Sequence, residues 1–489
     1  MKKRLLSLAL LVCMLLATAC TGTADPVDTK GASVDTSAVS SADEESTEKP
    51  DVPDDLYYDG RSFRILCTLD AWYGPADLDE FELDKSADVL SQAHYKRNTM
   101  IEERFGIDLE IYYTAEQTVD DVAIASVSAM SDDYDLVADV ADWHRGAVYE
   151  GIYMPVNDLP YVDLDKPWWN KAYIESVSVN PANPYILFGP INGNGLQRTI
   201  CGFFNIDLLT KTHGMTEQDM YDLVLDGEWT IDKMIEMCKG IYSDENGNTK
   251  PDDQDIYGFS HWNYWQVNFM AHSSGLKFTE RDEDGYPVLA LNNERSIALA
   301  DKLLTLFNNE DTYNHADNHG AVDFFATGHS LFHINRFFIS EWNEMRENPN
   351  INYGIIPAPK FDESIDNYYS AVANNGQWQM VPITEPDPEF ASAIIEYLAY
   401  YGQEYIIPAY YDISLKFKYV RGDVDGASKM LDLITSNMYT DFIGVNTVGG
   451  LENIFTDICR QGQNNFSSKY AMRESGANYR LKEYIQTLG

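Results

Sequence analysis

The sequence has few cysteines, few basic residues and only one long apolar run, and each of these shortages excludes a class of protein. Its 489 residues contain six cysteines, with no C-x-x-C pair of the kind that holds zinc or cycles a disulfide. Lysine and arginine number 35 against 78 aspartates and glutamates, which gives a formal charge of −43 at pH 7. Nucleic acid and anionic lipid surfaces are therefore poor partners, and the field favours a neutral or cationic solute over a polyanion.

The apolar run lies near the start of the sequence. A basic opening, Met-Lys-Lys-Arg, precedes residues 5–19, a run too short to span a bilayer. We therefore expect a signal peptide over residues 1–19. Its end, Leu-Ala-Thr-Ala-Cys, resembles the lipobox of bacterial lipoproteins. This resemblance implies that Cys20 carries fatty acyl chains such as palmitate, which anchor the protein on the extracellular face of the cell membrane. The alternative is a plain secretory signal.

A polar segment follows the signal peptide. Residues 20–57 are rich in Ser, Thr, Asp and Glu and have almost no large apolar side chains, so they cannot bury enough surface to offset the entropy of ordering. We expect a flexible tether there. The remaining stretch of about 430 residues is long for one domain and sufficient for two lobes.

Sequence signatures of catalysis are missing. There is no nucleophile elbow, phosphate-binding loop, triad signature or zinc-protease motif. Acidic residues are so numerous that a pair such as Asp139 and Asp142 does not by itself indicate glycoside hydrolysis. We therefore expect a protein that is not an enzyme, with a glycan-active extracellular enzyme as a competing hypothesis.

Strand-like and helix-like patterns alternate along the rest of the chain, which predicts α/β lobes around mainly parallel sheets. Strands are expected at 61–69, 107–113, 134–140, 200–207, 330–335 and 353–358. Helices are expected at 87–105, 119–130, 208–212, 229–242, 296–307 and 389–400, the fourth started by Thr230.

Six segments, in order and at the right spacing, carry a resemblance to a known family. They are Phe203–Leu209, Gly227–Met234, Asp255–Phe259, Phe325–Phe332, Asn352–Pro359 and Pro388–Leu398. They resemble segments of family 1 extracellular solute-binding proteins. The first five match that family's elements Tyr-Asn-x-Asp-Leu, Thr-Trp-Asp-Glu-Leu, Tyr-Gly-Phe, Phe-x-x-Gly-x-x-Ala-Met and Gly-x-x-Pro-x-Pro. The sixth matches the helix after the family's second crossover. That family serves ABC transporters and includes maltose- and oligosaccharide-binding proteins.

The resemblance implies a two-lobe α/β fold like that of class II periplasmic binding proteins, with hinge crossovers and a ligand cleft between the lobes. Lobe 1 is expected at 58–196 and 376–430, and lobe 2 at 199–373 and 431–489. The implied protein is a monomer that delivers a solute to ABC permease subunits and requires no cofactor. A glycan receptor that does not feed a transporter is the remaining alternative, because fold does not fix function.

A cleft for a hydroxyl-rich solute needs flat aromatic faces and planar polar groups. Such residues follow the expected strands or lie at the crossovers, and ordinary packing is the alternative for each aromatic ring. The candidates are Trp72, Tyr73, Asp139, Asp142, Trp143, Arg145, Gln197, Arg198, His261, Trp262, Trp265, Asn335, Arg336, Phe338, Asn374, Asn375 and Trp378.

The match to maltose-type members is uneven at these positions. Asp142 stands where they have a ligand-contacting acid, but Arg198 replaces a glutamate and Phe338 a tryptophan, which argues against maltose itself. We expect the bound solute to be a neutral oligosaccharide, and a peptide or amine-bearing solute is the alternative. Arg145, Arg198 and Arg336 would instead suit a carboxylate or uronic acid if all three face the cleft.

One acidic loop has the spacing of a calcium site. Oxygen-bearing side chains occupy loop positions 1, 3, 5, 9 and 12 of an EF-hand-like pattern, whereas position 6, which is usually glycine, is Thr249. The alternative is a solvated acidic turn. The candidate ligands of a structural calcium ion are Asp244, Asn246, Asn248, Asp252 and Asp255.

Overall fold

The computed structural model describes residues 48–69, 89–115, 119–141, 147–346, 348, 351–416 and 424–489. The following description concerns the compact unit Lys49–Gly489. The expected signal peptide, Cys20 and most of the expected tether lie outside the described residues. Among the described residues, no helix is both long and apolar enough to cross a membrane.

Four strands form the first sheet, in the order β11-β3-β1-β2. They are β1 (Arg61–Leu69), β2 (Ile107–Ala115), β3 (Leu136–Val140) and β11 (Gln377–Met380). β1 is parallel to β2 and to β3, whereas β11 comes from much later in the chain and is antiparallel to β3. The three strands predicted in this part of the sequence are all present.

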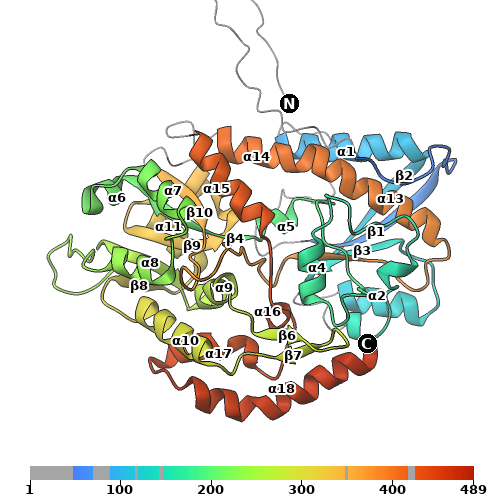
Figure 1. Cartoon of the computed structure of the whole chain (residues 1–489). Coiled ribbons are helices and arrows are strands. Elements are labelled where there is room, and N and C mark those ends of the chain that lie inside the picture. Colours follow the sequence, from blue (N-terminus) through green and yellow to red (C-terminus); the bar gives the residue numbers. More distant parts are fainter. Residues whose placement is uncertain are drawn as a thin grey trace, which may run out of the picture. The chain divides into compact units, whose positions relative to one another are not determined.

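Helices cover both faces of the first sheet. Because successive strand residues point to opposite faces, Phe63 packs in one core with α1 (Val89–Phe105) and α13 (Pro388–Tyr401), while Leu66 packs in another with α2 (Val119–Ser128). Figure 1 shows α1 and α13 side by side, with α2 on the other side of the strands. The first lobe is therefore a three-layer α/β structure.

Five strands form the second sheet, in the order β10-β4-β9-β5-β8. They are β4 (Ile200–Asn205), β5 (Tyr257–Trp262), β8 (Thr312–His315), β9 (Ser330–Arg336) and β10 (Tyr353–Pro357). β5 is parallel to β8 and β9, and β4 is antiparallel to β9 and β10. The sheet is therefore mixed, and β5 and β9 end at the same edge.

Side-chain caps start the helices around the second sheet. Thr230 accepts a hydrogen bond from the backbone N–H of Lys233, as the sequence predicted, and Asn205 and Asn293 cap two further helices in the same way. The helices are α6 (Ile206–His213), α7 (Glu217–Leu225), α8 (Ile231–Cys238), α9 (Trp265–Ser273), α10 (Glu294–Phe307) and α11 (Asn318–Ala326).

Three passes of the chain lie side by side between the two sheets. Residues 198–200 and 371–373 are joined by backbone hydrogen bonds of 2.7 and 2.9 Å, and residues 437–440 run alongside residue 370. Before the third pass, α15 (Val424–Ser436) packs on β10 of the second sheet. The lobe boundary expected at residue 430 therefore falls inside one helix.

The elements after the third pass complete the second lobe. A hairpin of β6 (Thr279–Arg281) and β7 (Pro287–Leu289) contacts the last helix. The closing helices are α16 (Phe442–Val445), α17 (Ile454–Gln461) and α18 (Phe466–Leu488).

Direct hydrogen bonds join the two lobes at one helix end. The first-lobe helix α4 (Lys171–Val177) ends in carbonyl groups that have no partner within the helix. Arg281 donates to three carbonyls of residues 175–179 at 2.7, 3.0 and 3.1 Å, and Asn446 donates to that of Val177 at 3.2 Å. We call this contact the α4 latch.

Candidate functional site

Aromatic and basic side chains meet at the edge where β5 and β9 end. Trp262 is the last residue of β5, and Arg336 is the last of the neighbouring parallel strand β9. The guanidinium carbon of Arg336 lies 5.7 Å from the ring centroid of Trp262 and 5.0 Å from that of Phe338. These distances are typical of cation–π contacts.

A second arginine approaches the same ring from the first crossover. Arg198 ends the short helix α5 (Asn194–Gln197), and its guanidinium carbon lies 4.7 Å from the centroid of Phe338. Arg198 is 2% exposed and Arg336 4%. Burial, and then the nearby positive charge of Arg336, lower the pKa of Arg198 to about 9. Two mutually repelling guanidinium groups therefore share one aromatic ring.

An aromatic row continues from this point along α9. The rings of Trp262 and Trp265 are nearly parallel, with centroids 6.3 Å apart and an interplanar angle of 23°, and Phe269 lies 6.1 Å from Trp262. Phe269 also lies 5.8 Å from the guanidinium carbon of Arg336. The row joins the arginine pair to the outer surface, because Trp265 is 44% exposed.

A cavity of about 280 Å³ opens beside the row. Its volume is near the lower end of the roughly 300–1,000 Å³ typical of small-molecule sites. It lies between α9, the second crossover and α16. The lining residues include Ile200, Trp265, Asn268, Phe269, His272, Asn374, Thr440, Asn446, Glu452 and Asn453. We call it the α9 cavity.

Arg336 stands next to the wall of the α9 cavity. Ile200, which lines the cavity, is the cross-strand partner of Arg336 in the β4–β9 ladder. Paired residues on neighbouring strands point to the same face and lie about 5 Å apart. Arg336 therefore lies next to a residue of the cavity wall, but neither Arg336 nor Arg198 is among the residues that line the cavity.

One buried polar group of the cavity wall and one in the neighbouring turn have side-chain atoms without a hydrogen-bond partner within the described chain. Asn375, 5% exposed, has both its amide oxygen and its amide nitrogen unsatisfied, and Nδ1 of His272 is also unsatisfied at the cavity wall. Burial lowers the pKa of His272 to about 4, so its ring is neutral at pH 7. Each such atom costs about 1–3 kcal/mol, which a polar ligand would offset.

In sequence, no protein-family model matches the chain, and no curated protein matches it. Solved structures match it in fold. A cyclo/maltodextrin-binding protein complexed with maltotetraose has a TM-score of 0.55 at 16% identity, over 91% of this chain and 100% of its own. An ABC-transporter solute-binding protein from Thermotoga lettingae, bound with α-D-tagatose, has 0.53 at 14% identity, over 87% and 100%. An ABC substrate-binding protein from Listeria monocytogenes, in complex with cycloalternan, has 0.53 at 10% identity, over 86% and 99%.

The chain has the two-lobe fold of ABC solute-binding proteins. The prediction of this α/β fold, with crossovers between the lobes, is therefore confirmed. At these identities the likeness shows the binding-protein fold alone, so the role of each residue has to be argued from its own surroundings.

The structure brings six of the predicted ligand-contact residues together. They are Arg198, Trp262, Trp265, Arg336, Phe338 and Asn374. Asn375 lies beside Asn374 in the turn that closes the second crossover. Trp72, Tyr73, Asp142, Trp143 and Arg145 lie outside the described residues.

Three further candidates, His261, Asn335 and Trp378, do not line the α9 cavity. His261 points to the opposite side of β5 from Trp262, where it is fully buried against Phe307, and burial lowers its pKa to about 3. Asn335 donates hydrogen bonds to side chains of the second lobe. Trp378, 3% exposed, donates through its indole N–H to the hydroxyl of Tyr173 at 3.2 Å.

The first-lobe candidates Asp139 and Gln197 are both buried. Oδ1 of Asp139 accepts a hydrogen bond from the backbone N–H of Val140 at 2.8 Å, and Gln197 is enclosed in α5 at 3% exposure. Neither is among the residues that line the cavity.

Sequence reasoning missed the inner face of α9. Asn268, Phe269 and His272 lie three, four and seven residues after Trp265, which places all four on one side of a helix. That spacing could have identified them once Trp265 was a candidate. Asn446 and Glu452 gave no such signal, because the third crossover brings them to the cavity from far along the chain.

The acidic loop at residues 244–255 is closed by its own hydrogen bonds. Asp244 accepts from the backbone N–H groups of Gly247, Asn248 and Thr249, and Asp252 accepts from two asparagine side chains. Thr249 has a φ of 61°, the left-handed conformation for which calcium loops use glycine at this position. The backbone therefore fits the calcium pattern, and calcium binding stays a prediction.

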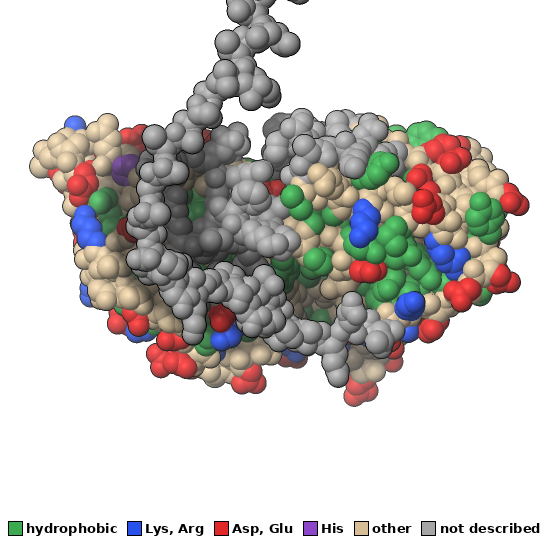
Figure 2. Space-filling view, turned by 90° about the horizontal axis from the view of Figure 1, so that it is seen from above, with side chains coloured by type: hydrophobic (Ala, Val, Ile, Leu, Met, Phe, Trp, Pro, Cys, Tyr) green, Lys and Arg blue, Asp and Glu red, His purple; other side chains and the backbone are tan. Residues whose placement is uncertain are grey.

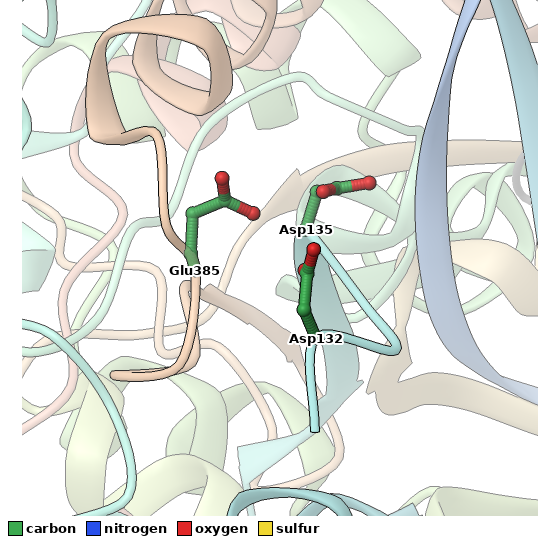
Figure 3. Close-up of side chains that lie close together, drawn as sticks. All are labelled: Asp132, Asp135 and Glu385. Atoms are coloured by element: carbon green, nitrogen blue, oxygen red, sulfur yellow. The ribbon is translucent and has the colours of Figure 1, made fainter. Parts of the chain in front are cut away.

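Another acidic cluster lies at the start of β3. Asp132, Asp135 and Glu385 each place a carboxylate oxygen within 4.8 Å of the others, the one such trio among the described residues. Figure 3 shows the carboxyl group of Glu385 pointing toward the two aspartates. Nη2 of Arg64 already lies 2.6 and 2.7 Å from Asp132 and Asp135. Because this guanidinium occupies the space beside both aspartates, the trio fits a structural clamp better than a metal centre.

A larger cavity, about 490 Å³, lies on another part of the crossovers. It is bounded by residues 167–172, residues 188–196 and α14 (Ile407–Lys416). Two tryptophans of its wall donate their indole N–H groups to the carboxylate of Glu396 at 3.0 and 2.8 Å. No buried side-chain polar atom among its described lining residues lacks a partner, so it makes a weaker ligand site than the α9 cavity.

Proposed function

We propose that this protein is the extracellular solute-binding subunit of an ABC importer and captures an oligosaccharide in the α9 cavity. The observation that carries the proposal is the aromatic row beside a cavity lined by Asn374 and by His272, whose Nδ1 atom has no hydrogen-bond partner within the described chain. The protein acts by binding, and we assign it no catalytic residue.

The chemistry of the site suits a sugar. The apolar C–H face of a pyranose ring stacks on an aromatic ring, and Trp265 offers such a face to solvent. Sugar hydroxyl groups both donate and accept hydrogen bonds, which matches the amide groups of Asn374, Asn268 and Asn446 in the cavity wall. The solved structures of this fold that contain maltotetraose, tagatose and cycloalternan agree with this assignment.

The membrane location rests on the sequence. We propose that residues 1–19 are removed as a signal peptide, that Cys20 carries the lipid and that residues 20–57 form the tether. The mature protein would then be a monomer held at the cell surface, where it meets the permease subunits. Metabolic labelling with a palmitate analogue tests this: the wild-type protein should be labelled and found in the membrane fraction, and Cys20→Ala should be unlabelled.

A peptide or amine-bearing solute is the second candidate. The acidic excess of the chain favours it, and Figure 2 shows acidic side chains spread over the visible described surface. The arginine pair at Phe338 disfavours it locally, because a cationic ligand would face two further positive charges. We therefore favour an oligosaccharide over a peptide or amine-bearing solute.

A thermal-shift screen tests the assignment. The soluble protein from Thr21 onward, which contains the whole compact unit Lys49–Gly489, is mixed with neutral and acidic saccharides, peptides and polyamines, because a ligand of the folded state raises the melting temperature. A saccharide should raise it, and Trp265→Ala should lower saccharide affinity at least about tenfold. Tyr479→Ala, which removes a 65% exposed ring from α18, is the control. A shift with peptides or polyamines alone would contradict the assignment.

A further inference from the structure

One charged side chain stands in the wall of the α9 cavity. Glu452, from η5 (Leu451–Asn453), is half-buried, and none of the other described residues that line the cavity is a lysine, an arginine or a second acid. Its Oε2 accepts a hydrogen bond from the backbone N–H of Val448 at 3.1 Å. Within the described residues no ion pair reaches this carboxylate, so its charge is open to a cationic ligand.

The turn before Glu452 is fixed to the last helix of the lobe. Gly449 has a φ of 61° and Gly450 one of 85°, both left-handed conformations that favour glycine. A Cβ atom on Gly449 would lie 2.5 Å from the backbone nitrogen of Ala477 in α18, so the two backbones touch there. The carbonyl of Gly450 accepts a hydrogen bond from Arg473 at 2.9 Å. The carboxylate of Glu452 is therefore held at the cavity wall by a rigid turn, which lowers the entropy lost on binding.

Basic side chains of α18 near this turn are paired with another acid. Arg473 also donates to the carboxylate of Asp457, and Nζ of Lys469 lies 4.0 Å from the same group. A charge that is half-buried without a counter-ion is unfavourable unless a ligand supplies one. Glu452 is thus the group whose charge the described chain leaves for a ligand to offset.

The other polar groups of the described wall are neutral at pH 7. Burial lowers the pKa of His272 to about 4, and the remaining polar side chains are amides, hydroxyl groups and an indole. The wall therefore carries a single negative charge, the same sign as the −43 of the whole chain. Both act to draw a cation into the cavity, and the low dielectric of a half-enclosed site strengthens the attraction.

The aromatic row and Glu452 border the same small space. Trp265, 44% exposed, and Glu452 both line a cavity of about 280 Å³, so one small saccharide reaches both. The arginine pair opposes a cation beside Phe338, but neither Arg198 nor Arg336 lines the cavity. A positive charge on the solute would therefore lie on the η5 side, against Glu452.

We propose that the solute is an amino sugar, or an oligosaccharide that contains one, whose ring stacks on Trp265 and whose protonated amine binds the carboxylate of Glu452. The inference rests on the proposed function, since it names the class of saccharide that the same site takes. The acidic excess of the chain would attract such a sugar and would have no such effect on a neutral one. A peptide or polyamine shares the charge but not the flat C–H face that stacks on an indole ring.

The test compares disaccharides that share one scaffold and differ at the second carbon of each ring. Chitobiose carries amines there, cellobiose hydroxyl groups and N,N′-diacetylchitobiose acetamides. These sugars, and glucosamine and galactosamine with their parent hexoses, are titrated calorimetrically into the soluble protein. At least one amino sugar should bind about ten- to a hundredfold more tightly than its hydroxyl parent, the range expected for a hydrogen bond to a charged group. That preference should shrink in high salt, which screens a half-exposed ion pair.

Three variants show whether Glu452 binds the amine. Glu452→Gln keeps an oxygen that can accept from the N–H of Val448 but loses the charge, and it should bring the affinity for the amino sugar down to that of its parent. Glu452→Asp keeps the negative charge on a shorter side chain and should retain part of the preference. Glu283→Gln removes an exposed carboxylate from the turn between β6 and β7, outside the cavity, and should leave the preference at its wild-type value.

The outcomes separate the inference from the proposed function. If the neutral or acetylated sugars bind at least as tightly as the amino sugars, or if Glu452→Gln retains the preference, the amino-sugar inference is overturned and the oligosaccharide function stands. If no saccharide of the three kinds binds, both are overturned.

Discussion

The carboxyl group of Glu385, at the end of the β11–α13 connection, lies near a basic and an acidic side chain. Its Oε1 accepts from the backbone N–H of Asp387 at 2.8 Å and lies 3.6 Å from Arg61, while its Oε2 is buried beside Asp135. Burial, and then the neighbouring acid Asp135, raise the pKa of Glu385 to about 8. The carboxyl group of Glu385 is therefore largely protonated at pH 7.

This raised pKa makes the stability of the protein fall as the pH rises. Below about pH 4.5 the carboxyl group is neutral in both the folded and the unfolded chain. Between about 4.5 and 8 only the unfolded chain releases the proton, so the free energy of unfolding falls by up to about 1.4 kcal/mol per pH unit, and above 8 the loss is complete. In Glu385→Gln this part of the pH dependence should be absent.

Urea unfolding at pH 5, 6, 7 and 8 measures the difference between the two proteins. Glu389→Gln, which changes an exposed carboxyl group in the first turn of α13, should behave as the wild type does. Parallel curves for Glu385→Gln and wild type would show that Glu385 is already ionised at neutral pH.

Thr249 is strained in the calcium-like loop. A β-branched residue at a φ of 61° has its side chain against the following carbonyl group, which costs roughly 1–2 kcal/mol. Thr249→Gly should therefore raise the free energy of unfolding by about 1 kcal/mol, measured by urea unfolding in EDTA. Gly247→Ala, at a φ of 72° in the same loop, should have the opposite sign.

The calcium prediction has a separate test. Titration of calcium into the metal-free protein should release or absorb heat and raise the melting temperature, because the ion binds the folded loop. Asp252→Asn, which removes a charge from the expected ninth position, should weaken the binding at least about tenfold. If wild type and Asp252→Asn respond alike, the loop is an acidic turn held by its own hydrogen bonds.

At the scale of elements, a one-turn π-helix marks the contact between the helices and the first crossover. The segment η4 (Gly402–Ile406) follows α13, and a Cβ atom on Gly402 would overlap the carbonyl oxygen of Pro190. A side chain there would push the helix away from the backbone on which it rests. Gly402→Ala should therefore lower the free energy of unfolding by about 3 kcal/mol, measured by urea unfolding.

The matched control lies in α18. A Cβ atom on Gly476 meets no atom within 4 Å, so Gly476→Ala should stabilise the helix by about 1 kcal/mol through propensity alone. Equal small effects of the two substitutions would mean that the approach of Gly402 to Pro190 is not tight in solution.

Most of the predicted helices and strands lie close to observed ones, because the sequence patterns that indicate them are local. β1 occupies the predicted residues 61–69, and α13 covers 388–401 where 389–400 was expected. The period of two in strands and the capping residue Thr230 act over a few neighbouring residues. β11, four residues long, gave no such signal, because its pairing with β3 depends on a chain segment more than 200 residues away.

At the scale of the whole molecule, the α4 latch holds the two lobes together at the border of the α9 cavity, because Asn446 both donates to Val177 and lines the cavity. Arg281 supplies three of its hydrogen bonds, all to backbone carbonyls of the first lobe. Arg281→Gln should therefore favour a more open arrangement of the lobes, with a larger radius of gyration without solute and a faster release of bound solute. Small-angle scattering and stopped-flow dissociation measure these two quantities.

Arg295→Gln provides the comparison, because Arg295 donates to Asp362 within the second lobe. Scattering curves for Arg281→Gln that match those of wild type, with and without solute, would show that the crossovers alone set the distance between the lobes.

The sequence by itself determined what depends on neighbours along the chain. The alternation of strands and helices, the caps, the charge imbalance and the candidates Arg198, Trp262, Trp265 and Arg336 follow from composition and from patterns of a few residues. These features set the kind of fold and the kind of side chain available for binding.

Only the tertiary structure decided which of those side chains share a site. The β4–β9 register places Arg336 beside Ile200, and two crossovers and α16 complete a cavity around α9. His261, adjacent to Trp262 in sequence, points instead into the core, because successive residues of a strand face opposite sides. Contacts between distant segments carry no local pattern, so burial and register had to be seen in the fold.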